Sequence, residues 1–251
     1  MNFKIILLIL CLILVLIFLI ISYSNIPWQI SAPIKDPEKA KKNGQELLAK
    51  SGRVLALAAH PDDLEYWVAG TLGKIIQKGG EVIIVVATTH KQEGKERKVE
   101  QKRAAEIMGY QKVVFLDLPD RELINFKNEL KNKINNLINK ENPQIIFVFD
   151  WEKEGRFYHH PDHQILGQVV LEIKKESKSS FLPYFYHTRE PDTLVDVTEI
   201  IDKKVEAFNA HKSQMHNFFS EDNRLKHLKR ISSYYGSLID VKYAEPLRKG
   251  W

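Results

Sequence analysis

Residues 54–63 read VLALAAHPDD, an apolar run that stops at a histidine, a proline and two aspartates. Six small or branched apolar residues in a row are typical of a strand buried on both faces. Pro61 cannot donate to a sheet ladder, so the strand is expected to end there. Apolar residues then recur at helical spacing until a pair of glycines. His60, Asp62 and Asp63 are therefore predicted to lie on a strand-to-helix turn, where open α/β sheets bind their ligands.

Strands and helices alternate along the chain that follows. This order is typical of an α/β, Rossmann-like three-layer fold, in which helices cover both faces of a mostly parallel sheet. The last two predicted strands are more exposed and leave antiparallel pairing open. The predicted elements are strands at 81–87, 112–118, 144–149, 183–187 and 194–197, helices at 96–108 and 126–140, and a helix that starts at Thr198 and ends at 211–214.

The N-terminus carries an uncharged apolar run at residues 5–21. Its seventeen residues reach the low end of the roughly 17–25 that span a bilayer as a helix. A cleaved signal is the alternative, but its apolar region runs only ~7–15 residues before a small-residue cleavage site, which is missing here. We therefore expect a single-pass membrane anchor at 1–24, a linker at 25–52 and a catalytic domain at 53–251. Lysines on both sides of the run leave the side of the membrane open.

The composition of the chain excludes some classes of binding partner and leaves others open. The chain has 251 residues and a formal net charge of +5, with charges of both signs interspersed. Basic residues form no stripe with interleaved aromatics, so nucleic acid is not an expected partner. An anionic membrane surface or substrate is compatible with the charge. The single cysteine, Cys11, excludes an intramolecular disulfide and a cysteine-based metal site in the domain.

A second polar cluster, YHHPDH at residues 158–163, follows the predicted strand at 144–149. A helical pattern begins behind it, so His163 is expected to open that helix. Alone, the cluster could equally be a polar loop with satisfied histidines. The carboxyl ends of parallel strands meet at one edge of a sheet, however, so this cluster and the turn at 60–63 can converge on one point. Convergence of that kind is what a metal site needs.

These residue types suit metal-assisted amide hydrolysis. Two histidines and one carboxylate leave open positions on Zn²⁺ for water and substrate. The metal lowers the pKa of its water and polarises a carbonyl. A second carboxylate can take the proton of the water, and a second histidine can steady the oxyanion and protonate a leaving amine. Zn²⁺ is the expected cofactor, and Fe²⁺ is the alternative because imidazole and carboxylate suit it too.

The motifs HPDD at 60–63 and HPDH at 160–163 resemble those of the LmbE-like/PIG-L deacetylases, zinc enzymes that remove acetyl groups from N-acetylglucosamine-type substrates. The resemblance covers about residues 53–248. Four further stretches fall in the family order, namely Arg103 with Glu106, 119–123, 210–214 and 243–245.

The resemblance implies a role for each motif residue. The zinc ligands would be His60, Asp63 and His163, and the general base would be Asp62. The electrophilic and acid partner would be His160, with Asp162 orienting it. The implied activity is a zinc-dependent N-deacetylase, a hydrolase of a linear amide C–N bond.

Departures from the family leave the substrate open. Leu64 stands where the family often has glutamate, and residues 67–70 replace a common glycine-rich stretch. Some membrane-bound members of the family act on a glycolipid, whereas the HPDH motif looks more like that of the bacterial branch. The expected substrate is therefore an acetylated amino sugar that is either a small molecule or part of a glycolipid. A metal-dependent phosphohydrolase and a noncatalytic sugar-binding module stay as alternatives. The oligomeric state is also left open.

Overall fold

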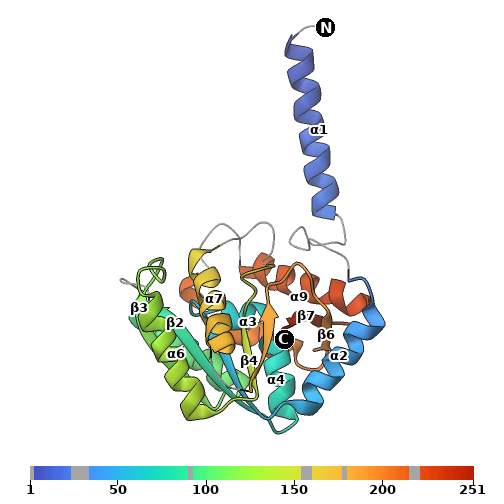
Figure 1. Ribbon diagram of the computed structural model, residues 1–251. Coiled ribbons are helices and arrows are strands. Elements are labelled where there is room, and N and C mark those ends of the chain that lie inside the picture. The colour runs from blue at the N-terminus through green and yellow to red at the C-terminus, as the bar shows by residue number, and fades with distance from the viewer. Residues whose placement is uncertain (1–2, 24–33, 90–92, 154–159, 177–179, 215–220) are drawn as a thin grey trace.

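The computed structural model describes residues 3–23, 34–89, 93–153, 160–176, 180–214 and 221–251 (Figure 1). Within them, one sheet has the strand order β3-β2-β1-β4-β5-β7-β6. The strands are β1 (Arg53–Ala58), β2 (Glu81–Thr89), β3 (Lys112–Pro119), β4 (Ile145–Phe149), β5 (Leu182–Tyr186), β6 (Thr193–Asp196) and β7 (Ala244–Lys249).

The sheet is parallel from β3 to β5 and antiparallel beyond it. β1 lies between β2 and β4, and β3 and β5 extend the parallel part on either side. β7 pairs antiparallel with both β5 and β6. The predicted mostly parallel α/β sheet is therefore present, and β7 is an added strand that the sequence pattern missed.

Helices cover both faces of the sheet. α6 and α7 pack against each other and contact β1, β3 and β4. A second group of helices, α3, α4, α5 and α8, packs together and contacts β2 and β3 (Figure 1). This gives the three layers expected of the fold class. The helices are α1 (Phe3–Tyr23), α2 (Pro37–Lys50), α3 (Asp63–Trp67), α4 (Ala69–Gln77), α5 (Gly94–Met108), α6 (Lys127–Glu141), α7 (Pro161–Glu176), α8 (Ile201–Asn209) and α9 (Glu221–Ser237), with a short 3₁₀ helix at Lys212–Gln214.

The strand that carries the first motif lies at the centre of the core. Residues 54–59 are at most 1% exposed, because helices lie over both faces of β1. This burial explains why the run has no polar alternation. It also fixes the point at which β1 ends, and so places His60 and the residues after it at the carboxyl edge of the sheet.

The expected membrane anchor is corrected by the structure. Among the residues that the structure describes, none of the helices is both long and apolar enough to cross a membrane. The predicted transmembrane helix over 5–21 is therefore wrong, as are the membrane location and the membrane partner inferred from it.

Part of the predicted linker packs on the sheet. Asp36 caps α2 by accepting a hydrogen bond from the Lys39 amide at 3.0 Å, and Leu47 is buried. A Cβ at Gly44 would stand 1.9 Å from the carbonyl oxygen of Leu194, so the helix lies directly against the backbone of β6. The predicted domain boundaries themselves stay a prediction.

Candidate metal centre and catalytic site

The first motif forms a tight turn between β1 and α3. Asp62 has φ 89° and ψ −23°, in the left-handed region, and Asp63 begins the helix. The carboxylate of Asp63 turns back and accepts a hydrogen bond from the His60 amide at 2.7 Å. The two neighbouring aspartates therefore point to different surroundings.

The second motif meets the first at the same sheet edge. His60, His160 and His163 each offer a ring nitrogen, and these atoms lie within 4.8 Å of one another. The Asp63 carboxylate lies between two of the rings, with Oδ1 3.4 Å from His163 Nε2 and Oδ2 3.6 Å from His60 Nδ1. His163 sits in the first turn of α7, where its ring stacks on Phe149 at a centroid distance of 3.6 Å. The predicted convergence of the two motifs is confirmed by these distances.

A third segment reaches the cluster from the loop after β3. Asp120 Oδ1 lies 2.9 Å from His60 Nε2, and Asp162 Oδ2 lies 3.4 Å from the same nitrogen. The Asp162 carboxylate also accepts hydrogen bonds from the amides of Arg121 and Leu123, at 2.7 and 3.2 Å. Asp162 thus ties the first turn of α7 to this loop.

The link between Asp162 and His160 runs through the backbone. The Asp162 amide donates to His160 Nδ1 at 3.3 Å, while its carboxylate faces the β3–α6 loop and His60. The Asp162 N–H is thus one group through which Asp162 can orient His160, and the orienting role itself stays a prediction. Tyr158 and His159, which belong to the same predicted cluster, lie outside the described residues.

The two neighbouring aspartates differ in pKa. Burial raises the pKa of Asp62 to about 6; Arg97 opposes this rise, and the Asp63 charge adds to it. Burial acts in the same direction on Asp63, but the rings of His163 and His60 outweigh it and hold the pKa of Asp63 well below its usual range. The ionised form is thus favoured more strongly at Asp63 than at Asp62, whose pKa lies closer to neutral pH.

The histidines also differ. Burial disfavours the charged ring of His60, but the carboxylates of Asp120, Asp162 and Asp63 outweigh it and raise the pKa of His60 above its ordinary value. Burial and the neighbouring His60 lower the pKa of His160. Positive charge is thus stabilised at the position of His60, among the three carboxylates.

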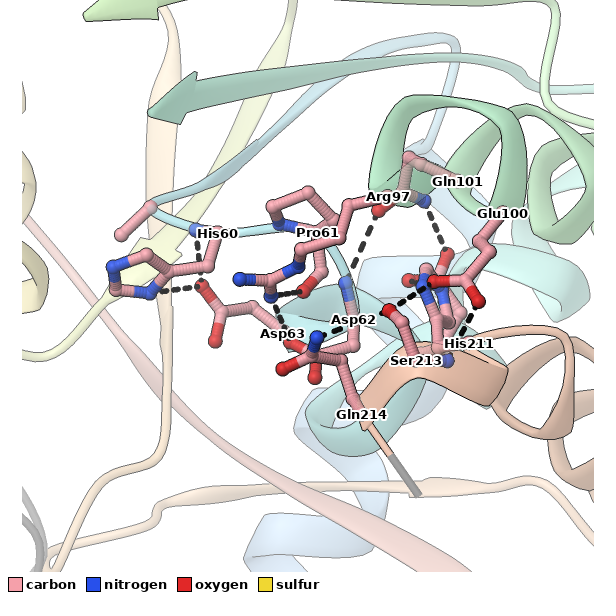
Figure 2. Close-up of polar contacts among 12 residues, drawn as sticks. His60, Pro61, Asp62, Asp63, Arg97, Glu100, Gln101, His211, Ser213 and Gln214 are labelled. Atoms are coloured by element: carbon pink, nitrogen blue, oxygen red, sulfur yellow. Dashed lines mark hydrogen bonds and ion pairs between the residues drawn. The ribbon is translucent and has the colours of Figure 1, made fainter. Parts of the chain in front are cut away.

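A polar network surrounds Asp62 from the side of α5 (Figure 2). Arg97 Nη2 donates to the carbonyl oxygen of Pro61 at 2.8 Å and lies 3.7 Å from Asp62 Oδ1. Gln101 Oε1 accepts from the Asp62 amide at 3.2 Å, and Gln101 Nε2 donates to Glu65 at 3.0 Å. The peptide and carboxylate of Asp62 are therefore held by one helix.

The run at 211–214 joins this network. His211 is fully buried, and its Nε2 lies 3.3 Å from Glu65 Oε2. Ser213 donates through its amide and its hydroxyl to Glu100, at 2.7 and 2.6 Å (Figure 2). A polar helix end that the sequence alone would leave in solvent is thus part of the support around Asp62.

Two Arg–Glu pairs with the same spacing lie on α5, and they differ in burial. Arg103 and Glu106 are exposed, whereas Arg97 and Glu100 carry the same three-residue spacing and face the site. Asp120 was also missed as an individual residue, although its segment was noticed. Helical register could have identified Arg97 and Glu100 as buried, because both lie on the same face of α5 as the buried Ala104.

The residues present fit a divalent cation. Imidazole nitrogens and an ionised carboxylate are the donors that Zn²⁺ accepts in open catalytic sites. Here His60, His163 and Asp63 bring such donors together in a buried place. Asp120 and Asp162 stand within 3.4 Å of His60 Nε2, and carboxylates that contact a ligating histidine in this way orient its ring.

A buried histidine–carboxylate cluster at the carboxyl edge of an open α/β sheet defines an α/β enzyme with a candidate metal centre. Residues 55–174 match the family profile described as "PIG-L: GlcNAc-PI de-N-acetylase". The chain carries a PIG-L/LmbE family domain, as its two motifs predicted.

Individual relatives agree with this family. The diacetylchitobiose deacetylase of Thermococcus kodakarensis is 28% identical over 90% of this chain and 88% of its own length. A probable N-acetyl-alpha-D-glucosaminyl L-malate deacetylase 2 of Bacillus anthracis is 28% identical over 64% of this chain and 80% of its own. The solved N,N'-diacetylchitobiose deacetylase of Pyrococcus horikoshii superposes with a TM-score of 0.71 at 26% identity, covering 82% of this chain and 86% of its own. Such N-deacetylases are hydrolases of amide bonds, and the prediction of an enzyme of this class is confirmed.

Proposed function

We propose that this protein is a Zn²⁺-dependent deacetylase that removes the acetyl group from the nitrogen of an N-acetylglucosamine-type sugar conjugate. One observation carries the proposal. The Asp63 carboxylate lies between the rings of His60 and His163, at 3.6 and 3.4 Å, while its neighbour Asp62 is held apart with its own contacts. This arrangement supports a metal-ligand role for Asp63 and a proton-transfer role for Asp62.

His60, Asp63 and His163 would hold the metal. A divalent cation there supplies Lewis acidity toward the amide carbonyl and lowers the pKa of water. Zn²⁺ fits this donor set best, and Fe²⁺ is the alternative. The three protein ligands leave room for water and substrate.

The remaining residues move protons. Water oxygen forms a bond to the acetyl carbonyl carbon, and Asp62 accepts the proton that the water loses. When the carbon–nitrogen bond breaks, the nitrogen takes the proton that Asp62 accepted, while the neutral ring of His160 donates a hydrogen bond to the carbonyl oxygen, and acetate and a free amine are released. The Asp162 amide, 3.3 Å from His160 Nδ1, orients that ring.

The relatives narrow the substrates worth testing. One acts, by its name, on diacetylchitobiose and another on an N-acetylglucosaminyl malate. In this chain Trp67 stacks on His187 at a centroid distance of 4.1 Å, four residues beyond Asp63. Because Trp67 stands in the stretch that departs from the family's glycine-rich pattern, we expect the selectivity among sugar conjugates to differ from that of the relatives.

The test is acetate release by the purified protein. Zinc-loaded protein is incubated with diacetylchitobiose, an N-acetylglucosaminyl malate and a glycolipid that carries N-acetylglucosamine, and acetate and free amine are measured together. Equal amounts of both products are expected from at least one substrate, and none after removal of the metal. Phosphate release from phosphorylated analogues without acetate would favour a phosphohydrolase. Binding without turnover would favour a sugar-binding module.

A further inference from the structure

One peptide group in the site is held at both of its ends. The carbonyl of Pro61 and the amide N–H of Asp62 belong to the same peptide unit. Arg97 Nη2 donates to that carbonyl at 2.8 Å, and Gln101 Oε1 accepts from that N–H at 3.2 Å. Arg97 and Gln101 are four residues apart on α5, so they project from the same face of the helix (Figure 2).

The orientation of this peptide determines the backbone conformation of Asp62. Its φ is the rotation about the bond from its nitrogen to Cα, and the value of 89° lies in the left-handed region. Residues with a Cβ avoid that region because the Cβ crowds the backbone. A turn of the peptide plane would release Asp62 from this conformation and re-aim its carboxylate.

We propose that Arg97 and Gln101 are positioning residues that clamp the Pro61–Asp62 peptide and so aim Asp62 at the reacting water. The proposal rests on the proposed function, in which Asp62 is the general base. A residue in a strained backbone conformation persists only where contacts from its neighbours hold it there. Such residues are most common at functional sites, where the strain is part of the mechanism. Arg97 and Gln101 provide such contacts, and both come from one helix, α5.

The amide of Gln101 is suited to this task because it both accepts and donates. Its Oε1 takes the Asp62 N–H, while its Nε2 donates to Glu65 Oε1 at 3.0 Å. Glu65 in turn lies 3.3 Å from His211, and all three side chains are at most 1% exposed. A carboxylate at position 101 would face the Glu65 carboxylate, and an apolar side chain would lose both hydrogen bonds.

Replacing Gln101 by a neutral residue tests the position of Asp62 without removing a charge from its surroundings. Arg97 lies 3.7 Å from the Asp62 carboxylate, so its removal changes the charge around Asp62 as well as the clamp. Gln101 is neutral, and its hydrogen bond to Asp62 is to the backbone N–H and not to the carboxylate. A change in turnover on replacing Gln101 therefore reports the position of Asp62.

The variants are Gln101→Met, which matches the side chain in size, Gln101→Glu, and Arg97→Lys, which keeps the charge. Lys102→Met, an exposed position on the same helix, is the control. We expect kcat of both Gln101 variants to fall ~10–100-fold, the order that a misplacement of about 1 Å can produce. KM, one zinc per chain and the kcat of Lys102→Met should be unchanged. Arg97→Lys, whose amine is too short to reach the Pro61 carbonyl, should also lower kcat.

Crystal structures of the wild type and Gln101→Met provide a second readout. We expect the φ of Asp62 to leave the left-handed region in the variant. A Gln101→Met protein with wild-type kcat, or with φ of Asp62 still near 89°, would overturn the clamp. So would a loss of thermal stability without a loss of kcat per zinc-loaded site, which is the result of a merely structural residue. If the wild type releases no acetate, the proposed function fails, and the φ of Asp62 in the two structures still decides for or against the clamp.

Discussion

The two edges of the parallel sheet use different residues for the same backbone conformation. At the amino edge, three helices end in left-handed residues just before a strand, namely Gly79 (φ 86°), Gly109 (φ 84°) and Asn142 (φ 46°). The amides of all three donate back to carbonyls in the last turn of their helix. Glycine and asparagine adopt this conformation at little energetic cost, and it is a common end for a helix.

At the carboxyl edge the left-handed residues after three of the strands are neither glycine nor asparagine, and each lies at or beside the candidate site. They are Asp62 (φ 89°) after β1, Arg121 (φ 63°) after β3 and His187 (φ 53°) after β5. Asp62 is the proposed base, and the Arg121 amide holds Asp162. The imidazole of His187 stacks on Trp67 beside the site.

The difference shows where this fold tolerates strain. Where a turn only has to reverse the chain, the residue is one that relaxes the backbone. Where a residue contributes a side chain or an amide to the site, it is kept despite the strain, because neighbouring contacts hold it. The predictions below test this division, beginning with the largest expected effect.

The largest effect on stability is expected from replacing Glu245, whose contacts stabilise the carboxyl edge of the sheet. The Glu245 carboxylate accepts hydrogen bonds from the amides of Gly70 and Thr71 at the start of α4 and pairs with the buried Lys204 at 2.5 Å. Glu245→Leu would leave that ammonium buried without its partner. We expect a loss of ~3–5 kcal/mol in the free energy of unfolding, measured by urea denaturation.

A matched variant separates charge from packing. Lys204→Met leaves Glu245 with three donors, the two amides and the Thr71 hydroxyl at 2.7 Å. Its loss of stability should be clearly smaller than that of Glu245→Leu. Equal losses would mean that the ion pair, and not the cap on α4, is what supports the edge.

The next effect concerns the metal. His163→Ala removes one of three proposed ligands. Changing a residue that only contacts a metal ligand lowers metal affinity ~10–100-fold, so the loss of a ligand itself should lower zinc affinity by at least about 100-fold. Elemental analysis after dialysis against a weak chelator measures this, with His227→Ala, on α9 away from the cluster, as the control. Full zinc occupancy in His163→Ala would show that the ligand set is wrong.

The smallest effect compares the two edges directly. Asp62→Gly should relieve the left-handed strain and raise the free energy of unfolding of the metal-free protein by about 1 kcal/mol while abolishing turnover. Gly79→Ala should lower it by about 1 kcal/mol, since a Cβ there meets no neighbour within 4 Å and only the backbone conformation resists it. Activity should be unchanged in Gly79→Ala. A destabilised Asp62→Gly protein would show that strain is not concentrated at the carboxyl edge.

The sequence predicted the parts of the site that follow an apolar strand. The run at 54–59 and the strand at 145–149 are buried on both faces, so their pattern shows where each ends and which polar residues come next. Parallel topology then places both motifs at one edge of the sheet, where His60 and His163 can meet. These inferences need only local pattern and one rule about sheets.

The missed residues depend on tertiary context. On α5, Arg97 and Gln101 are buried while Val99 is 67% exposed, the reverse of what hydrophobic periodicity assumes. The buried face is polar there because it packs on the turn of the first motif rather than on apolar core. β7 was missed for a related reason, since Pro246, Arg248 and Lys249 resemble a loop until pairing with β5 and β6 is known.

The central claim is that Asp62 and Asp63 have separate roles, and both are changed to asparagine in parallel to test it. Zinc stoichiometry and kcat for acetate release are measured on each variant. We expect Asp62→Asn to keep one zinc per chain and to lose ~10²–10⁴-fold in kcat, as for a lost general base. Asp63→Asn should lose zinc, because a neutral amide is a poorer ligand than a carboxylate. Zinc lost from Asp62→Asn and kept by Asp63→Asn would reverse the roles, and full zinc and full activity in both would contradict the deacetylase mechanism.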